Sequence, residues 1–400
     1  MLAEPETRAR DARHRIQAAL RERLLPISPL GDEGHQSLVL EAGEAGTFTI
    51  ATRAGRVFVN EGRAARPGAV VRTDAETLLE ILTGARSGAQ TWLSGHLSLR
   101  GSIALALRLE GLLDPARRPR HFAQPRRVLA GGVDTFLLEA GEGPAVVLLH
   151  GLGATNASML TTFVELSRDH RVIAPDLPGF GDSAKPVARY DARFFAQWAV
   201  ALLDALGIER AHFIGNSMGG RISLEVGLLA PARVDRLVLF APAVAFRKLR
   251  QFVPLVRMLR PELATLPVPL PRRTVLRTLQ QCFSRPDRLP AAWYEAAVDE
   301  FIRVFGTARG RVAFFSSARQ IYLDPPWGAA GFWARLRELE PPALFVWGDR
   351  DVLVPSRFAR HVERMVPHAR SVVLRDCGHV PHFELPETTH RLVREHLRTG

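Results

Sequence analysis

Residues 211–229 place an apolar strand, a tight turn with a central serine and an amphipathic helix in direct succession. The turn reads Gly-Asn-Ser-Met-Gly at positions 215–219. Small residues on both sides of a serine let the chain pass sharply from strand to helix and expose the hydroxyl, which is a poor nucleophile unless a base lies beside it. The helix that starts there points free backbone amides at a developing oxyanion. The segment predicts Ser217 as a nucleophile and the Met218 amide as one oxyanion donor.

Strands and helices alternate around this turn from about residue 127 onward. Strands are expected at 133–139, 145–150, 171–175, 211–215, 237–240, 343–347 and 371–374, and helices at 194–206, 218–229 and 387–397. The run Ala-Val-Val-Leu-Leu-His at 145–150 is apolar throughout, as a parallel strand buried on both faces should be. The alternation predicts an α/β fold in which helices cover both faces of a parallel sheet.

Two loops that follow predicted strands complete the oxyanion side of the site. His-Gly-Leu-Gly at 150–153 comes directly after a buried strand, and we assign the second oxyanion donor to the Leu152 amide. Asp-Leu-Pro-Gly-Phe-Gly-Asp-Ser at 176–183 is expected to shape the floor of the site without a catalytic role.

An acid and a base follow the serine in chain order. Two aspartates compete for the acid, and we choose Asp351, which directly precedes a Val-Leu-Val-Pro run, over Asp349, a better turn residue. His379 lies in a glycine-flanked loop after the last strand and is the expected base. His382 invites a metal-site interpretation, but no second ligand cluster accompanies it, so no metal is expected.

About 100 residues between Phe240 and Ala343 are too many for a simple crossover and predict a helical cap at about 243–338. Helical periodicity is expected at 246–259, 273–283, 291–305 and 309–323. Most apolar residues of this segment must form the core of the cap, and a minority should face the serine and favour an apolar acyl or alkyl group. The candidates for that pocket are Phe252, Val256, Met258, Phe301, Phe305 and Phe314.

The chain changes character at its amino-terminal end. A proline-containing charged run at 114–121 predicts a linker, which we place at 114–126 between a first domain at 1–113 and a second at 127–400. In the first domain a helix is expected at 6–24, strands at 37–41, 46–52 and 56–60, a helix at 74–82 and a last helix at 103–113.

Composition limits the partners and the compartment. Hydrophobic residues make up 46% of the 400-residue chain and charged residues 24%, as in a globular protein, and the start of the chain lacks the apolar core of a secretory signal. Two cysteines in no metal-like spacing favour a reducing cytoplasm. The net charge of +12 is nearly all arginine. We interpret it as solvated helix faces, with weak contact to an anionic membrane as the alternative and no nucleic-acid partner. The oligomeric state stays open.

Both halves resemble known families. "VVRTDAETLLEILTG" followed by "SGHLSLRGSIALALRLEGLL" resembles the sterol carrier protein family, which implies a small α+β domain with an apolar tunnel for lipid-like ligands. Residues 127–400 resemble the α/β-hydrolase superfamily, in which Ser217, Asp351 and His379 fall where that family's triad falls. The elbow Gly-Asn-Ser-Met-Gly-Gly and the later Cys-Gly-His look like those of carbon–carbon bond hydrolases of ring-fission products. However, the loop at 150–155 and Val380 depart from that branch.

The residues therefore predict a serine hydrolase that needs no cofactor, most simply a carboxylic ester hydrolase that acts on hydrophobic substrates through an acyl-enzyme. One alternative is hydrolysis of a carbon–carbon bond. Another is a lipid-binding carrier whose hydrolase half is vestigial, although packing alone does not require all three triad residues together.

Overall fold

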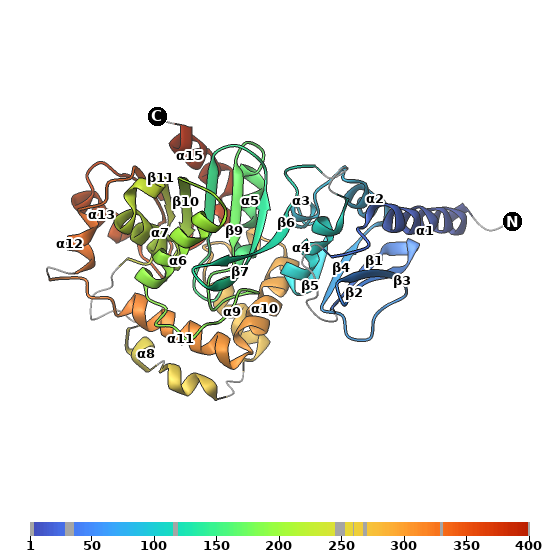
Figure 1. Cartoon of the computed structure of the whole chain (residues 1–400), viewed down its shortest axis with the longest axis horizontal. Coiled ribbons are helices and arrows are strands. Elements are labelled where there is room, and N and C mark those ends of the chain that lie inside the picture. The colour runs from blue at the N-terminus through green and yellow to red at the C-terminus, as the bar shows by residue number, and fades with distance from the viewer. Residues whose placement is uncertain are drawn as a thin grey trace. The chain divides into compact units, whose positions relative to one another are not determined.

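The computed structural model describes residues 4–28, 36–114, 119–244, 253–258, 260–266, 270–328 and 331–398 (Figure 1). It divides into two compact units. The first comprises 1–126, 138–141 and 290–300, and the second comprises 127–137, 142–289 and 301–400. The predicted linker at 114–126 lies partly outside the described residues, and its last residues already form the start of a strand.

The first unit is an α+β domain with a five-stranded sheet in the order β3-β2-β1-β4-β5. Strand β1 pairs in parallel with β4, and the other neighbours are antiparallel. The elements are α1 (Glu4–Arg23), β1 (Gln36–Ala42), β2 (Thr47–Arg53), β3 (Arg56–Glu61), β4 (Ala69–Thr73), α2 (Ala75–Thr83), α3 (Gly88–Leu93), β5 (Ser98–Gly101) and α4 (Ile103–Leu112). The expected α+β class is confirmed; β4 and the short α3 had not been predicted.

The described part of this unit holds a small apolar cavity. The cavity measures about 30 Å³, and its lining includes Leu78, Trp92 and Leu107 together with the buried Glu110. That volume accommodates a water molecule or two and no lipid. The Glu110 carboxylate accepts hydrogen bonds from the Ser87 hydroxyl and from the Ala89 and Ala123 amides, while burial raises its pKa. The expected tunnel for lipid-like ligands stays a prediction.

The second unit is built on an eight-stranded sheet in the order β13-β12-β11-β10-β8-β9-β7-β6, with β8 to β13 running parallel. The strands are β6 (Gln124–Ala130), β7 (Val133–Ala140), β8 (Ala145–Leu149), β9 (Arg171–Pro175), β10 (Ala211–Asn216), β11 (Val234–Phe240), β12 (Ala343–Gly348) and β13 (Arg370–Leu374). The helices are α5 (Leu160–Leu166), α6 (Ala192–Ala205), α7 (Met218–Leu229), α8 (Val253–Met258), α9 (Arg272–Gln280), α11 (Ala308–Tyr322), α12 (Phe332–Leu336), α13 (Ala359–Met365), α14 (Pro381–Glu384) and α15 (Pro386–Arg398). Helix α10 (Ala291–Phe305) is divided between the two units after Glu300. The expected α/β fold is confirmed.

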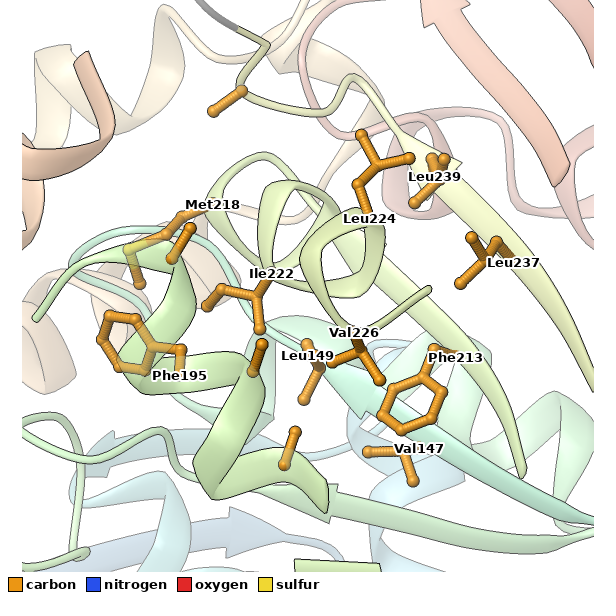
Figure 2. Packing of buried hydrophobic residues seen from close by; sticks show 14 of the residues in the cluster. Val147, Leu149, Phe195, Phe213, Met218, Ile222, Leu224, Val226, Leu237 and Leu239 are labelled. Carbon is orange, nitrogen blue, oxygen red and sulfur yellow. The ribbon is translucent and has the colours of Figure 1, made fainter. Parts of the chain in front are cut away.

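The core of this unit lies between the sheet and helix α7, which follows the serine turn. Figure 2 shows Ile222 and Val226 of α7 packed over Leu149 of β8 and Phe213 of β10. All four side chains are fully buried. Burying an aliphatic or aromatic side chain contributes roughly 1.5–3 kcal/mol, so this layer fixes α7, and the turn before it, against the sheet.

The strand order places the site. From β8 the chain continues to β9 on one side of β8 and then to β10 on its other side. Such a reversal opens a crevice at the carboxyl ends of the strands, where ligands of open α/β sheets bind. The loop after β8 and the turn after β10 both end at this crevice.

The predicted cap is helical, with corrections. Residues 246–252 and 259 of its first predicted helix, Phe252 among them, lie outside the described residues, and α8 covers the described part. The side chain of Met258 is 72% exposed, so it does not line an apolar pocket as expected. No helix in the described ranges is long and apolar enough to cross a membrane.

Candidate active site

Ser217 sits at the sharp turn between β10 and α7 with backbone angles φ 54° and ψ −111°. Few non-glycine residues adopt such a conformation, and it persists only where neighbouring structure enforces it. A Cβ atom on Gly219 would lie 2.0 Å from the Leu149 carbonyl oxygen, and one on Gly215 would lie 2.3 Å from the Gly219 carbonyl carbon. Both glycines are therefore required for the chain to turn against β8 and expose the serine.

Asn216, the residue before the serine, ties the turn to the histidine loop. Its Nδ2 donates to the carbonyl oxygen of Phe240 at 3.1 Å and to that of His379 at 3.0 Å. Sequence reasoning assigned no role to this side chain. This hydrogen bond joins Asn216, the neighbour of Ser217, to the backbone of His379, 163 positions later in the chain.

Asp351 and His379 form a buried pair. The histidine Nδ1 lies 2.7 Å from Asp351 Oδ2, while Asp351 Oδ1 accepts the amides of Leu353 at 2.7 Å and Val354 at 2.9 Å. A carboxylate that only accepts selects the tautomer with the proton on Nδ1, which leaves Nε2 free to accept a proton. The other candidate, Asp349, is exposed and accepts the Cys377 amide at 3.3 Å, so it supports the histidine loop from outside.

The loop after β8 lies against the serine. A Cβ atom on Gly151 would lie 3.5 Å from the Ser217 Cβ. Among the described residues, the amides of Leu152 and Met218 donate no hydrogen bond to the backbone. The two amides predicted to bind the oxyanion therefore lie in segments next to Ser217. Among the described residues, neither amide is bound to a backbone carbonyl.

His150 fixes the shape of this loop, a role that the sequence had not indicated. Its Nε2 accepts the Leu177 amide at 3.0 Å, so Nδ1 carries the proton and donates to the Gly151 carbonyl at 2.8 Å. Burial lowers the pKa of His150 to about 4, which keeps the ring neutral. The ring thus joins the oxyanion loop to the 176–183 loop, whose structural role had been expected.

Glu384 joins the histidine loop to the cap. Its Oε2 accepts the amides of Gly378 at 2.7 Å and Ser284 at 3.1 Å, and its Oε1 accepts the Arg285 amide at 2.7 Å. The side chain is fully buried. Beside it, the His379 amide donates to the Cys282 carbonyl at 2.6 Å. The catalytic loop and this part of the cap are therefore held by one carboxylate.

Phenylalanines of the cap pack against Gly153, in the loop after β8. A Cβ atom on Gly153, which has φ +75°, would lie 2.8 Å from a Phe314 ring carbon and 2.9 Å from one of Phe301. These rings pack edge to face, 6.3 Å apart, and both contact Phe305. Two of the predicted pocket residues, Phe301 and Phe314, thus lie against the loop after β8, while Phe305 and Val256 are buried.

His382 has a structural role. Its Nε2 lies 2.9 Å from the Ser158 carbonyl, its ring stacks on Phe240 at 4.9 Å, and burial lowers its pKa to about 3. Within the described ranges, no group of three or more potential ligands could hold a metal ion.

Comparison with known proteins agrees with this architecture. Residues 144–386 match the family described as "alpha/beta hydrolase fold". The chain belongs to the α/β-hydrolase fold family. Residues 34–114 match the SCP-2 sterol transfer family, so the first unit carries a sterol-carrier-type domain.

The curated relatives and solved structures compared below cover 65–80% of the chain. The chain is 31% identical to a 2-hydroxymuconate semialdehyde hydrolase of a Pseudomonas species over 65% of its own length and 88% of the relative. It is 30% identical to a 2-hydroxy-6-oxo-2,4-heptadienoate hydrolase of Pseudomonas putida, over 68% of this chain and 95% of that relative. A membrane phospholipase A structure superimposes with a TM-score of 0.59 at 25% identity, over 80% of this chain and 94% of that one. The structure of a 2-hydroxy-6-oxo-6-phenylhexa-2,4-dienoate hydrolase from a Rhodococcus species superimposes with a TM-score of 0.58 at 27% identity, over 69% of this chain and 99% of that one.

Proposed function

We propose that this hydrolase cleaves carboxylic esters with an apolar acyl group through a covalent acyl-enzyme on Ser217. The observation that carries the proposal is the serine turn joined by Asn216 to a histidine that is itself paired, at 2.7 Å, with a buried aspartate. Both contacts support the assignment of Ser217, His379 and Asp351 as nucleophile, base and orienting acid of acyl transfer.

In this mechanism the neutral His379 takes the proton of the Ser217 hydroxyl as its oxygen attacks the ester carbonyl. Asp351 keeps the imidazole in the Nδ1–H tautomer and stabilises the imidazolium that forms. The amides of Leu152 and Met218 stabilise the oxyanion, and the imidazolium returns the proton to the leaving alcohol. His379 then takes a proton from a water that attacks the acyl-enzyme carbonyl. The acid leaves as the imidazolium returns this proton to the Ser217 oxygen. No step requires a cofactor.

The phenylalanine wall over Gly153 supports an apolar acyl group. Apolar surface beside a few fixed polar groups is typical of sites for hydrophobic ligands. The likeness to a membrane phospholipase A, by its name an enzyme of lipid esters, agrees with this proposal.

Hydrolysis of a carbon–carbon bond is the second candidate, and the identity of 30–31% to two ring-fission-product hydrolases favours it. The dienoate substrates named for such relatives carry a carboxylate, which needs a cationic or polar partner. The rings of Phe301 and Phe314 offer none, so we place ester hydrolysis first.

The sterol-carrier-type unit is proposed to hold a lipid-like ligand, which its match to the SCP-2 sterol transfer family supports. A carrier with a vestigial hydrolase half is disfavoured, because the paired His379 and Asp351 and the serine turn at Ser217 support an active site. The cytoplasm remains the proposed compartment, since Cys282 and Cys377 are both free thiols.

The test measures hydrolysis of p-nitrophenyl esters of increasing acyl length and of a 2-hydroxy-6-oxo-dienoate. Ser217→Ala should abolish turnover, a loss of up to about 10⁶-fold in kcat, whereas Ser356→Ala, a half-buried serine outside the site, should leave it unchanged. Faster cleavage of the dienoate than of every ester would favour the second candidate. Equal ester turnover in both variants would disprove the serine mechanism.

A further inference from the structure

The charge of the chain is concentrated in one short stretch of the cap. Residues 247–277 contain eight basic residues and one acidic residue, Glu262, a net charge of +7 out of the +12 of the whole chain. More than half of the net charge of the chain therefore lies in this stretch. Such a concentration of one sign of charge creates a local field that attracts an oppositely charged partner.

Four arginines in the described part of this stretch are exposed and without an ion-pair partner among the described residues. They are Arg257, Arg260, Arg273 and Arg277. Some surface arginines of the same unit are paired, as Arg210 at 2.8 Å from Asp235 and Arg233 at 2.7 Å from Asp204. Others in the described part of the unit, such as Arg357 and Arg360, are exposed without an ion pair, so the charge density of the stretch is what distinguishes it. We call the described residues 253–258, 260–266 and 270–277 the basic cap segment.

The basic cap segment also exposes large apolar side chains. Met258, beside Arg257, is 72% exposed, and Leu266 is 60% exposed. Exposed apolar side chains among arginines are typical of surfaces that insert shallowly into a bilayer, where the apolar groups enter the acyl boundary and the cations contact lipid phosphates. A surface that binds nucleic acid needs cations but has no use for a protruding methionine and leucine.

The segment lies one helix away from the active site. Helix α11 contacts the oxyanion loop through Phe314. The same helix holds the segment: Arg311 Nε donates to the Ala264 carbonyl at 2.8 Å, and Arg319 Nη1 donates to the Arg257 carbonyl at 2.5 Å. Figure 1 shows α8 beside α11 at the lower edge of the second unit. A lipid surface that binds the segment would therefore lie close to the covered site.

We propose that the basic cap segment docks the hydrolase unit on an anionic lipid surface. The four unpaired arginines bind headgroup phosphates, and Met258 and Leu266 enter the boundary between headgroups and acyl chains. Each arginine near such a surface strengthens binding roughly fivefold, and the attraction is screened within about 10 Å at 0.1 M salt. This docking proposal depends only on the basic cap segment and not on which bond Ser217 cleaves.

The experiment measures co-sedimentation of the full chain with phosphatidylglycerol–phosphatidylcholine vesicles and with phosphatidylcholine vesicles, at low and high NaCl. The charge variant replaces Arg257, Arg260, Arg273 and Arg277 by Gln. The control variant makes the same charge change elsewhere, at the exposed residues Arg193, Arg357, Arg360 and Arg364. A third variant, Met258→Ser with Leu266→Ser, tests insertion.

We expect the native chain to bind anionic vesicles in a salt-sensitive manner, the charge variant to bind at least tenfold more weakly, and the control to stay within about threefold. The Met258/Leu266 variant should lose the binding that survives high salt. Equal losses in the charge and control variants, or equal binding to both kinds of vesicle, would overturn the proposal. Binding of duplex DNA that the charge variant abolishes, without vesicle binding, would overturn it in favour of nucleic acid. Circular dichroism and activity on a soluble ester check that every variant is folded.

Discussion

Replacing Glu384 by Gln should loosen the catalytic histidine loop and the cap together. The buried carboxylate accepts three backbone amides, two at one oxygen and one at the other. An amide side chain keeps one acceptor oxygen and turns an NH₂ donor toward the remaining backbone amide. At least one buried charge-assisted hydrogen bond is lost, which costs about 1.5–3 kcal/mol, and the surviving bonds lose their charge. A total near 3 kcal/mol corresponds to a fall in Tm of about 6–12 °C for a unit of this size.

The assay combines thermal unfolding with steady-state kinetics on a soluble ester. Because Gly378 directly precedes His379, a displaced loop should lower kcat by about tenfold or more while KM changes less, since misplacement of about 1 Å can cost 10²-fold. Glu338→Gln, at an exposed glutamate of the same unit, is the matched control. If Glu384→Gln melts within 2 °C of that control and keeps its kcat, the bridging role assigned to Glu384 is wrong.

Three further predictions concern the acid, the buried histidines and the thiols. Asp351→Asn should lower kcat by about 10⁴-fold with little loss of secondary structure, because the histidine then adopts the wrong tautomer; an equal effect of Asp349→Asn would contradict the assignment. Burial lowers the pKa of five histidines of the hydrolase unit, to about 3 for one and about 4 for four, so below pH 6.5 the unfolded chain binds more protons than the folded one and stability falls with pH. Together they should lower the Tm as the pH falls from 7 to 5, and a flat profile would contradict this. These residues are His150, His212, His382, His390 and His396. Burial raises the pKa of both thiols, Cys282 and Cys377, to about 12, so each should react with a disulfide reagent at pH 8 only after unfolding, and rapid labelling of the folded chain would refute it.

The sequence predicted the features that depend on local pattern. Continuous apolar strands, the alternation of strands and helices and the glycine-bounded serine turn each arise from neighbouring residues, so their positions agree with β8, β10 and α7 to within a residue or two. The short α3 and strand β4 were missed because six and five residues carry too little periodicity.

The residues that hold the loops of the site in place could not be predicted in the same way. Asn216, His150 and Glu384 act through hydrogen bonds to backbone groups of other loops, and two of these contacts join segments about 100 residues or more apart. Backbone acceptors and donors are present at every position, so no residue type in the partner segment marks the contact in advance. Only the folded sheet brings those loops to one edge.

The wide spacing of the site along the chain has a consequence for synthesis. The serine turn and the histidine loop are 163 residues apart, and a ribosome adding about 5–20 residues per second needs about 10–30 s to make the chain between them. During that interval the nascent protein holds the nucleophile without its proposed base and acid. The nascent chain is therefore expected to have no hydrolase activity until β12, β13 and the loop after them have been synthesised and have joined the sheet. Esters present during translation should then not be cleaved by the incomplete chain.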